Sequence, residues 1–139
     1  MTSDPNCIFC KIVAGTIPCF KLYEDSATLA FMDINPANPG HCLIIPKSHH
    51  PNLFETPPAV LGQVMATVHR VANAVQAVVA PDGMNLVQAN GKGAEQSVLH
   101  FHMHVMPRRI GDELKLNWGL KPGDMKAIGA LAERIRAVV

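Results

Sequence analysis

The segment from Val98 to Pro107 constrains the fold more than any other, because histidine alternates there with apolar residues. Side chains of a strand point in turn to its two faces, so the alternation predicts a strand over Val98–Met106. The apolar face must join the core, and the opposite face carries three imidazoles over roughly 13 Å of strand. The apolar residues are Phe101, Met103 and Val105, and the histidines are His100, His102 and His104.

Three histidines on one strand face admit three interpretations. In the first, the histidines are unrelated polar residues on a solvated face, although Lys, Thr or Glu would suit water as well. In the second, they bind a metal ion, because alternate histidines on a strand can reach one ion. In the third, one imidazole is a nucleophile, and its neighbours orient it and bind the substrate.

The loop before this strand, Asn90–Ser97, favours an anion site. Gly91 and Gly93 let backbone N–H groups approach an anion, and Gln96 and Ser97 add neutral donors. Next to a histidine strand, such a loop predicts a phosphate cradle of the kind that phosphoryl or nucleotidyl transfer requires. The sequence contains no Asp/Glu cluster with magnesium-ligand spacing, so we expect no obligatory Mg²⁺.

The remaining elements are short and alternate without a repeat or a linker. Strands are predicted at 20–24, 28–33, 41–45 and 84–89, a short turn or helix at 7–13, and a C-terminal helix at about 122–138. A long helix starts at Thr56 and ends before Pro81. Its predicted apolar face consists of Leu61, Met65, Val68, Ala72, Val75 and Val79. Together these elements predict an α+β fold with a five-stranded, mainly antiparallel sheet and two main helices.

Composition excludes several classes of function. A chain of 139 residues with 48% hydrophobic residues fits one folded domain. Its net charge of +1 argues against nucleic-acid binding and against binding to an anionic membrane. We expect no signal peptide and no membrane span. The four cysteines include Cys7-x-x-Cys10, and nothing in the sequence suggests secretion. This spacing then indicates metal or redox chemistry and not a disulfide, so we predict a reducing, cytoplasmic location.

Several segments, in their order along the chain, resemble the histidine triad (HIT) family of nucleotide hydrolases and transferases. They are Cys7–Ile12, Phe31–Pro36, Gly40–His49, Gly91–Ser97 and His100–Met106, the last of which fits His-φ-His-φ-His-φ-φ. The resemblance covers residues 7 to about 109. It implies that residues 1–139 form a single HIT domain, with 110–139 as a C-terminal extension containing a helix. It also implies the HIT-type α+β fold and pairing into a homodimer.

The resemblance also implies roles for single residues. His102 matches the family nucleophile, which attacks the α-phosphorus and forms a nucleotidyl-histidine intermediate. His104 matches the residue that contacts the phosphate, and His41 matches an additional active-site histidine. The positions that match phosphate or leaving-group contacts are Asn90, Gln96 and Ser97. Those that match the wall around base and ribose are Phe9, Phe31, Asp33 and Ile34, with Asp33 as the expected ribose-hydroxyl acceptor.

A zinc site is the second implication. The bacterial branch of the family combines a Cys-x-x-Cys, the histidine after Ile-Pro-Lys-x and the first triad histidine as ligands. On that pattern the ligands are Cys7, Cys10, His49 and His100, a set that closes a tetrahedral shell and makes the ion structural. His50 is one residue off the pattern. The alternative is two buried thiols and two surface imidazoles.

The implied function is a homodimeric hydrolase that acts at the α-phosphate of purine nucleotide conjugates. The Cys-x-x-Cys block favours the bacterial-type branch, which is related to phosphoramidases. The segment Pro107–Asp112 instead resembles the dinucleoside-polyphosphate branch. Arg108 and Arg109 in it either lie on a solvated strand end or attract a polyphosphate tail. A non-catalytic purine-nucleotide-binding regulator is the third possibility. Trp118 is expected to contact the dimer partner or to anchor packing.

Overall fold

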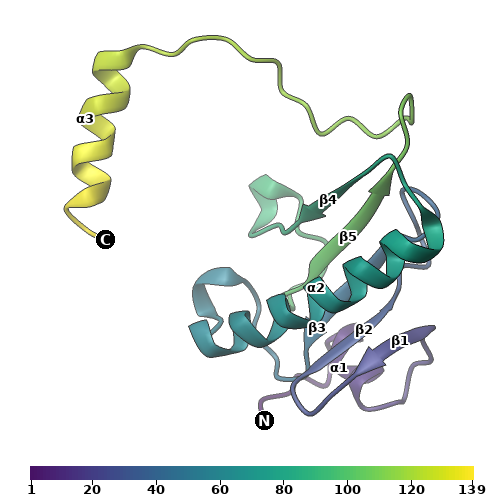
Figure 1. Cartoon of the computed structure of the whole chain (residues 1–139). Helices are drawn as coiled ribbons and strands as arrows, with labels where there is room; N and C mark the ends of the chain where they lie inside the picture. Colours follow the sequence, from purple (N-terminus) through teal and green to yellow (C-terminus); the bar gives the residue numbers. More distant parts are fainter.

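The computed structural model describes all 139 residues and contains one five-stranded sheet in the order β1-β2-β3-β5-β4. Every neighbouring pair of strands is antiparallel, so the predicted α+β architecture is confirmed (Figure 1). In chain order the elements are α1 (Ile8–Val13), β1 (Lys21–Glu24), β2 (Thr28–Met32), β3 (Cys42–Pro46), the 3-10 turn η1 (Leu53–Glu55), α2 (Pro58–Val79), β4 (Gly83–Val87), the 3-10 turn η2 (Lys92–Ala94), β5 (Met103–Arg108) and α3 (Met125–Arg136). The strands β1 to β4 lie within two residues of their predicted ranges.

The two faces of the sheet bury two separate apolar clusters. Alternation along β2 and β3 turns Ala30 and Ile44 toward α2, and Leu29 and Ile45 toward α1. The cluster under α2 also includes Phe101 and Val105, from the predicted apolar face of the histidine segment (Val98–Pro107). The imidazoles are therefore left on the α1 side of the sheet.

The long helix α2 buries most of its predicted face: Val68 and Val75 are buried, and Leu61, Ala72 and Val79 pack against the core. Val64, Thr67 and Val71 are buried, whereas Met65, a predicted core residue, is 45% exposed. A hydrogen bond of 2.7 Å between the hydroxyls of Thr67 and Thr28 joins the buried side of the helix to β2. On the side of Met65 the helix has a second partly apolar face, which lines a groove together with Met84 and Leu86 of β4.

The histidine segment is strand only in its second half. β5 begins at Met103, not at Val98 as predicted, so His100 and His102 precede the strand. The ladder to β3 pairs only Cys42–Ile44. It cannot continue to Pro46, which has no backbone N–H to donate. Phe101 instead donates its N–H to the carbonyl of His50, at 2.6 Å.

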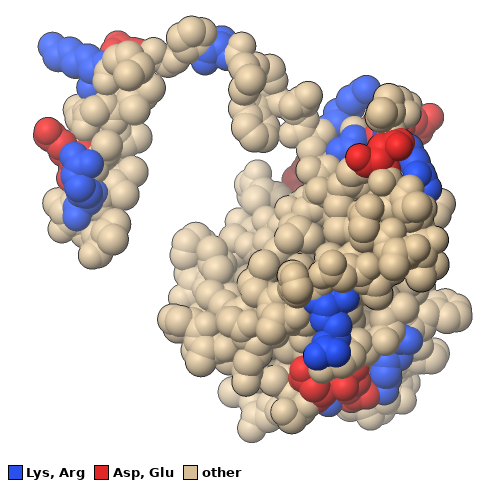
Figure 2. Space-filling view, in the orientation of Figure 1, with Lys and Arg blue, Asp and Glu red and all other residues tan.

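Beyond Asp112 the chain leaves the body as a C-terminal arm, residues 113–139, that ends in α3 and stands apart from the sheet (Figure 1). Asp124 caps α3 by accepting hydrogen bonds from Lys126 and Ala127 N–H, so the helix begins at Met125 and not at the predicted residue 122. Figure 2 shows the charged side chains of α3 gathered on one side of it. Trp118 is 85% exposed and anchors no packing within its own chain. None of the helices combines the length and hydrophobicity needed to cross a membrane.

Candidate functional site

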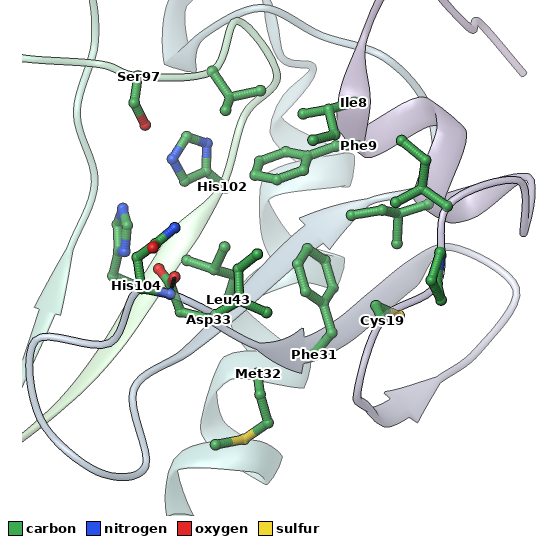
Figure 3. Close-up of a pocket in the computed structure, with 16 residues that line it drawn as sticks. Ile8, Phe9, Cys19, Phe31, Met32, Asp33, Leu43, Ser97, His102 and His104 are labelled. Carbon is green, nitrogen blue, oxygen red and sulfur yellow. Dashed lines mark hydrogen bonds between the residues drawn. The ribbon is translucent and has the colours of Figure 1, made fainter.

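A cavity of about 340 Å³ opens on the α1 side of the sheet, beside the histidine segment (Figure 3). It brings together seven residues that sequence reasoning assigned to one site: Phe9, Phe31, Asp33, Ile34, Ser97, His102 and His104. The polar residues among them gather at one end, and the apolar wall from α1 and β2 forms the other (Figure 3). A flat apolar group and an anionic group can therefore be bound side by side.

His102 is held in one tautomer by the backbone before it. Its Nδ1 lies 2.6 Å from the carbonyl oxygen of His100, which can only accept, so Nδ1 carries the proton. Nε2 is therefore left with its lone pair. The Phe9 ring packs edge-on against the imidazole, with 5.2 Å between ring centroids. Burial lowers the pKa of His102, which keeps the ring neutral near pH 7.

His41 and His104 form a hydrogen-bonded chain that fixes a second proton. The N–H of Ala37 donates to His41 Nδ1 at 3.0 Å, so the His41 proton is on Nε2. Nε2 lies 2.9 Å from His104 Nδ1 and donates to it. His104 must then carry its own proton on Nε2, which is a donor available to the cavity. His41 is fully behind His104 and does not line the cavity.

Burial is the main cause of the altered proton affinities. It lowers the pKa of His104 to about 4, with smaller contributions from the charges of His102 and His41. It also lowers the pKa of His41, although the carboxylate of Asp33, 3.5 Å from His41 Nε2, acts in the opposite direction. At neutral pH the site thus holds neutral imidazoles, one with an exposed lone pair and one with an exposed N–H.

Asn90 and Gln96 lie outside the cavity lining and brace the loop around Ser97. The Asn90 side-chain oxygen accepts the N–H of Leu53 at 2.8 Å. Gln96 accepts the Gly91 N–H at 2.8 Å and donates to the carbonyl of Pro51 at 2.6 Å. Their predicted contacts with substrate stay predictions. The bracing leaves Ser97 exposed at the polar end of the cavity.

Several lining residues were not predicted from the sequence. Leu43 is opposite His104 in the register of β3 and β5 and so reaches the cavity floor. Met32 at the end of β2 and Asn35 in the loop after it also line the cavity. The remaining additions are apolar or small and come from α1, the segment after it and the loop before His100: Ile8, Ile12, Ile17, Pro18, Cys19 and Val98. No periodicity singles out these residues, because the three segments meet only in the folded chain.

Two thiols and two imidazoles form a second cluster behind the histidine segment. Cys7 is the N-cap of α1 and Cys10 lies one turn later, so both sulfurs point to the same side. His49 and His100 complete the cluster, each through its Nδ1 atom. The four candidate ligand atoms all lie within 4.8 Å of one another. His50 is turned away and contacts the Ser48 hydroxyl at 3.1 Å.

The spacing of this cluster matches a tetrahedral shell. Zinc–sulfur bonds of about 2.3 Å and zinc–nitrogen bonds of about 2.0 Å give S···N edges near 3.5 Å and N···N edges near 3.3 Å. The S···N distances are 3.5 Å for Cys7 to His100, 3.4 Å for Cys10 to His49 and 3.6 Å for Cys10 to His100. The two Nδ1 atoms are 3.3 Å apart. His100 Nε2 donates to the carbonyl of Pro46 at 2.8 Å, which leaves Nδ1 free to bind a metal.

A third group, Asp33, His41 and His104, is also close enough to bind an ion but has the wrong protonation. Its two ring nitrogens are 2.9 Å apart, a hydrogen-bond distance. A metal on His41 Nε2 would force a proton onto Nδ1, where the Ala37 N–H already donates. The group is therefore a proton chain and not a metal site.

The two arginines after the histidine segment are already engaged. Arg108 binds both carboxylate oxygens of Asp112, at 2.8 and 2.7 Å, and holds the pKa of that carboxyl well below its usual range. Arg109 donates to the carbonyls of Val79 and Ala80 at the end of α2. Neither points into the cavity.

Comparison with known proteins gives one consistent family. Residues 14–111 match the HIT domain. The chain is 38% identical over 135 residues to an adenosine 5′-monophosphoramidase of Schizosaccharomyces pombe, covering 96% of this chain and 98% of the relative. It is 42% identical over 125 residues to an adenylylsulfatase of Arabidopsis thaliana, covering 90% of this chain but 64% of that longer protein.

Solved structures agree with the fold. A HIT family protein from Bacillus anthracis superposes with a TM-score of 0.91 at 38% identity over 99% of both chains, the C-terminal arm included. A zinc-bound histidine triad family protein from Mycobacterium smegmatis superposes with a TM-score of 0.75 at 38% identity, covering 95% of this chain and 97% of that one.

Proposed function

This chain belongs to the HIT domain family, and from that premise we propose that it hydrolyses purine nucleoside phosphoramidates or related nucleotide conjugates at the α-phosphate. The observation that carries the proposal is the buried, neutral His102, whose Nδ1–H is bound to the His100 carbonyl and whose Nε2 lone pair is free. Relatives named as adenosine 5′-monophosphoramidase and adenylylsulfatase act on conjugates of this class.

The proposed chemistry has two steps. His102 Nε2 attacks the α-phosphorus and forms a P–N bond, while the bond to the leaving amine breaks and the amine takes a proton from solvent. The imidazolium that results keeps its Nδ1–H on the His100 carbonyl, which stabilises the positive charge. Water then attacks phosphorus, the P–N bond to His102 breaks, and the water proton returns to solvent.

The other cavity residues supply binding and charge stabilisation. The Nε2–H of His104 and the hydroxyl of Ser97 are neutral donors for the phosphate oxygens, on which negative charge builds up during attack. Phe9, Phe31 and Ile34 provide the apolar wall for a base, and Asp33 at the edge of that wall is the acceptor for a ribose hydroxyl.

The leaving group is tested by a substrate panel. We expect kcat/KM on adenosine 5′-phosphoramidate to exceed that on dinucleoside polyphosphates by at least about tenfold, because Arg108 and Arg109 are engaged elsewhere and no Lys or Arg side chain lines the cavity. Adenylyl sulfate belongs in the panel as the substrate class of the Arabidopsis relative. A preference for dinucleoside polyphosphates would contradict the proposed substrate. Tight nucleotide binding without hydrolysis of any panel member would favour the regulatory alternative.

The cluster of Cys7, Cys10, His49 and His100 is the proposed zinc site. Its tetrahedral spacing and its thiolate-imidazole donor set fit zinc, and the Mycobacterium smegmatis protein is a zinc-bound relative. With four protein ligands the ion would be structural: it would tie α1 to the segment before β5 and so hold the His100 carbonyl that orients His102.

The homodimer is proposed on the second face of α2. Met65 and Leu86 are each almost half exposed and line, with Met84, a groove between α2 and the edge strand β4. An exposed apolar groove beside an unpaired strand edge favours a second copy as its occupant. In sedimentation experiments the wild type should have the mass of two chains, and the Leu86→Lys variant the mass of one. A monomeric wild type would refute the proposal.

The four free cysteines support a reducing, cytoplasmic location.

A further inference from the structure

The β2–β3 loop, residues 33–41, holds His41 and is fastened to the body at one side chain. Its residues from Ile34 to Ala37 and Pro39 are exposed, but Asn38 is half-buried. The Asn38 amide donates to the Pro107 carbonyl at 3.0 Å and to Asp112 Oδ2 at 2.9 Å. Both partners accept only, so the amide orientation follows from the network.

The fastened loop delivers the donor that fixes His41. The Asn38 carbonyl accepts the N–H of His41 at 3.1 Å, and the adjacent Ala37 N–H donates to His41 Nδ1 at 3.0 Å. Gly40, with φ of +93°, lets the loop lie so close that an added Cβ would be 2.9 Å from a Val79 methyl. The loop thus sits on the ends of α2 and β5, and Asn38 is its polar attachment.

We infer that Asn38 is a positioning residue for the hydrolysis: by clamping the loop to Pro107 and Asp112 it keeps the Ala37 N–H on His41 Nδ1 and so sets the proton of His104. The chain runs from Ala37 N–H to His41, from His41 Nε2–H to His104 Nδ1, and leaves the His104 Nε2–H for the substrate. Without the clamp, His41 can take its proton on Nδ1 and present a lone pair to His104. His104 would then offer the substrate oxygens a lone pair in place of a donor.

The clamp also ties this proton chain to the base of the C-terminal arm. The carboxylate of Asp112 accepts hydrogen bonds from the Asn38 amide and from Nε and Nη2 of Arg108. The third nitrogen, Nη1 of Arg108, donates to Asn85 on β4 at 2.8 Å. The acceptor for Asn38 is therefore an ionised carboxylate held rigidly between two strands and the arm. Such charge-assisted hydrogen bonds hold geometry better than neutral ones.

The inference rests on the proposed function for its kinetic part only. In two-bond ¹⁵N–¹H spectra of the full chain, the wild type should show His41 protonated on Nε2 and His104 protonated on Nε2. Asn38→Ala should shift both rings toward the other tautomer. It should also lower kcat on adenosine 5′-phosphoramidate about tenfold with KM changed less than about twofold, since a misplaced histidine proton impairs catalysis while binding survives.

The matched control is Asn117→Ala, which removes the same amide from an exposed position in the arm and should change neither readout. A wild type with the His41 proton on Nδ1 overturns the inference without recourse to any variant. An Asn38→Ala protein in which His41 and His104 keep their wild-type tautomers and kcat is unchanged also overturns the inference. Failure to hydrolyse any nucleotide would refute the proposed function instead, and the tautomer spectra would still test the clamp.

Discussion

His102→Ala should lower hydrolysis of adenosine 5′-phosphoramidate by at least about 10⁴-fold, because removal of a covalent nucleophile leaves only the contribution of binding and placed donors. The neighbouring imidazoles are engaged elsewhere, His104 by His41 and His100 by the Pro46 carbonyl, so neither is free to replace the lost nucleophile. Steady-state kinetics on purified protein measure the loss, and nucleotide affinity should change far less.

The covalent step has its own test. Acid-quenched wild type should carry one labelled nucleotide on histidine, and His102→Ala should carry none. Two successive displacements also require overall retention of configuration at a chiral phosphorus. Inversion would exclude the nucleotidyl-histidine intermediate even if the variant were inactive. His69→Ala, which changes an exposed histidine on α2, is the control for the loss of an imidazole and should keep full activity.

Removal of zinc should destabilise the fold. With free zinc about 1,000-fold above its Kd, binding stabilises the native state by about 4 kcal/mol. Chelation should therefore lower the melting temperature by roughly 10–15 °C in a chain of this size. The reason is that Cys7, Cys10, His49 and His100 join three segments that are distant in sequence, and burial raises the pKa of the Cys7 thiol unless a cation is bound.

Metal analysis and calorimetry together check this expectation. Cys10→Ser should lose the metal and the stability that chelation removes, whereas Cys19→Ser, at a thiol outside the cluster, should still bind one zinc per chain. Protein purified without added zinc that contains no metal and melts at the same temperature with and without chelator would contradict the proposed site.

The sequence was sufficient to locate the histidines and insufficient to locate their protons. Alternation placed Phe101 and Val105 in the core correctly, because a strand-like backbone has a period of two whether or not it is paired. The tautomers depend on the His100 carbonyl and the Ala37 N–H, which no spacing rule brings to a ring nitrogen. The same limit explains the start of β5, which is set by Pro46 on a neighbouring strand.

Other differences have tertiary causes as well. Met65 fits the apolar period of α2 but lines the open groove beside the edge strand β4, where no further strand covers it, and it stays 45% exposed. The family resemblance implies phosphate or leaving-group contacts for Asn90 and Gln96, and these contacts stay predictions. In the fold their amides find backbone partners first, at Leu53, Gly91 and Pro51. Arg108 and Arg109 likewise find a carboxylate and a helix end.

His100 makes three contacts that no other residue can supply together: Nδ1 faces the thiols, Nε2 holds the Pro46 carbonyl, and its backbone oxygen receives His102. An engineer who wants a metal-free form should therefore rebuild the cluster at Cys7, Cys10 and His49, and leave position 100 untouched. Apolar replacements at those three positions would fill the same space around the His100 imidazole, whose hydrogen bond to Pro46 would still hold the backbone carbonyl that orients His102.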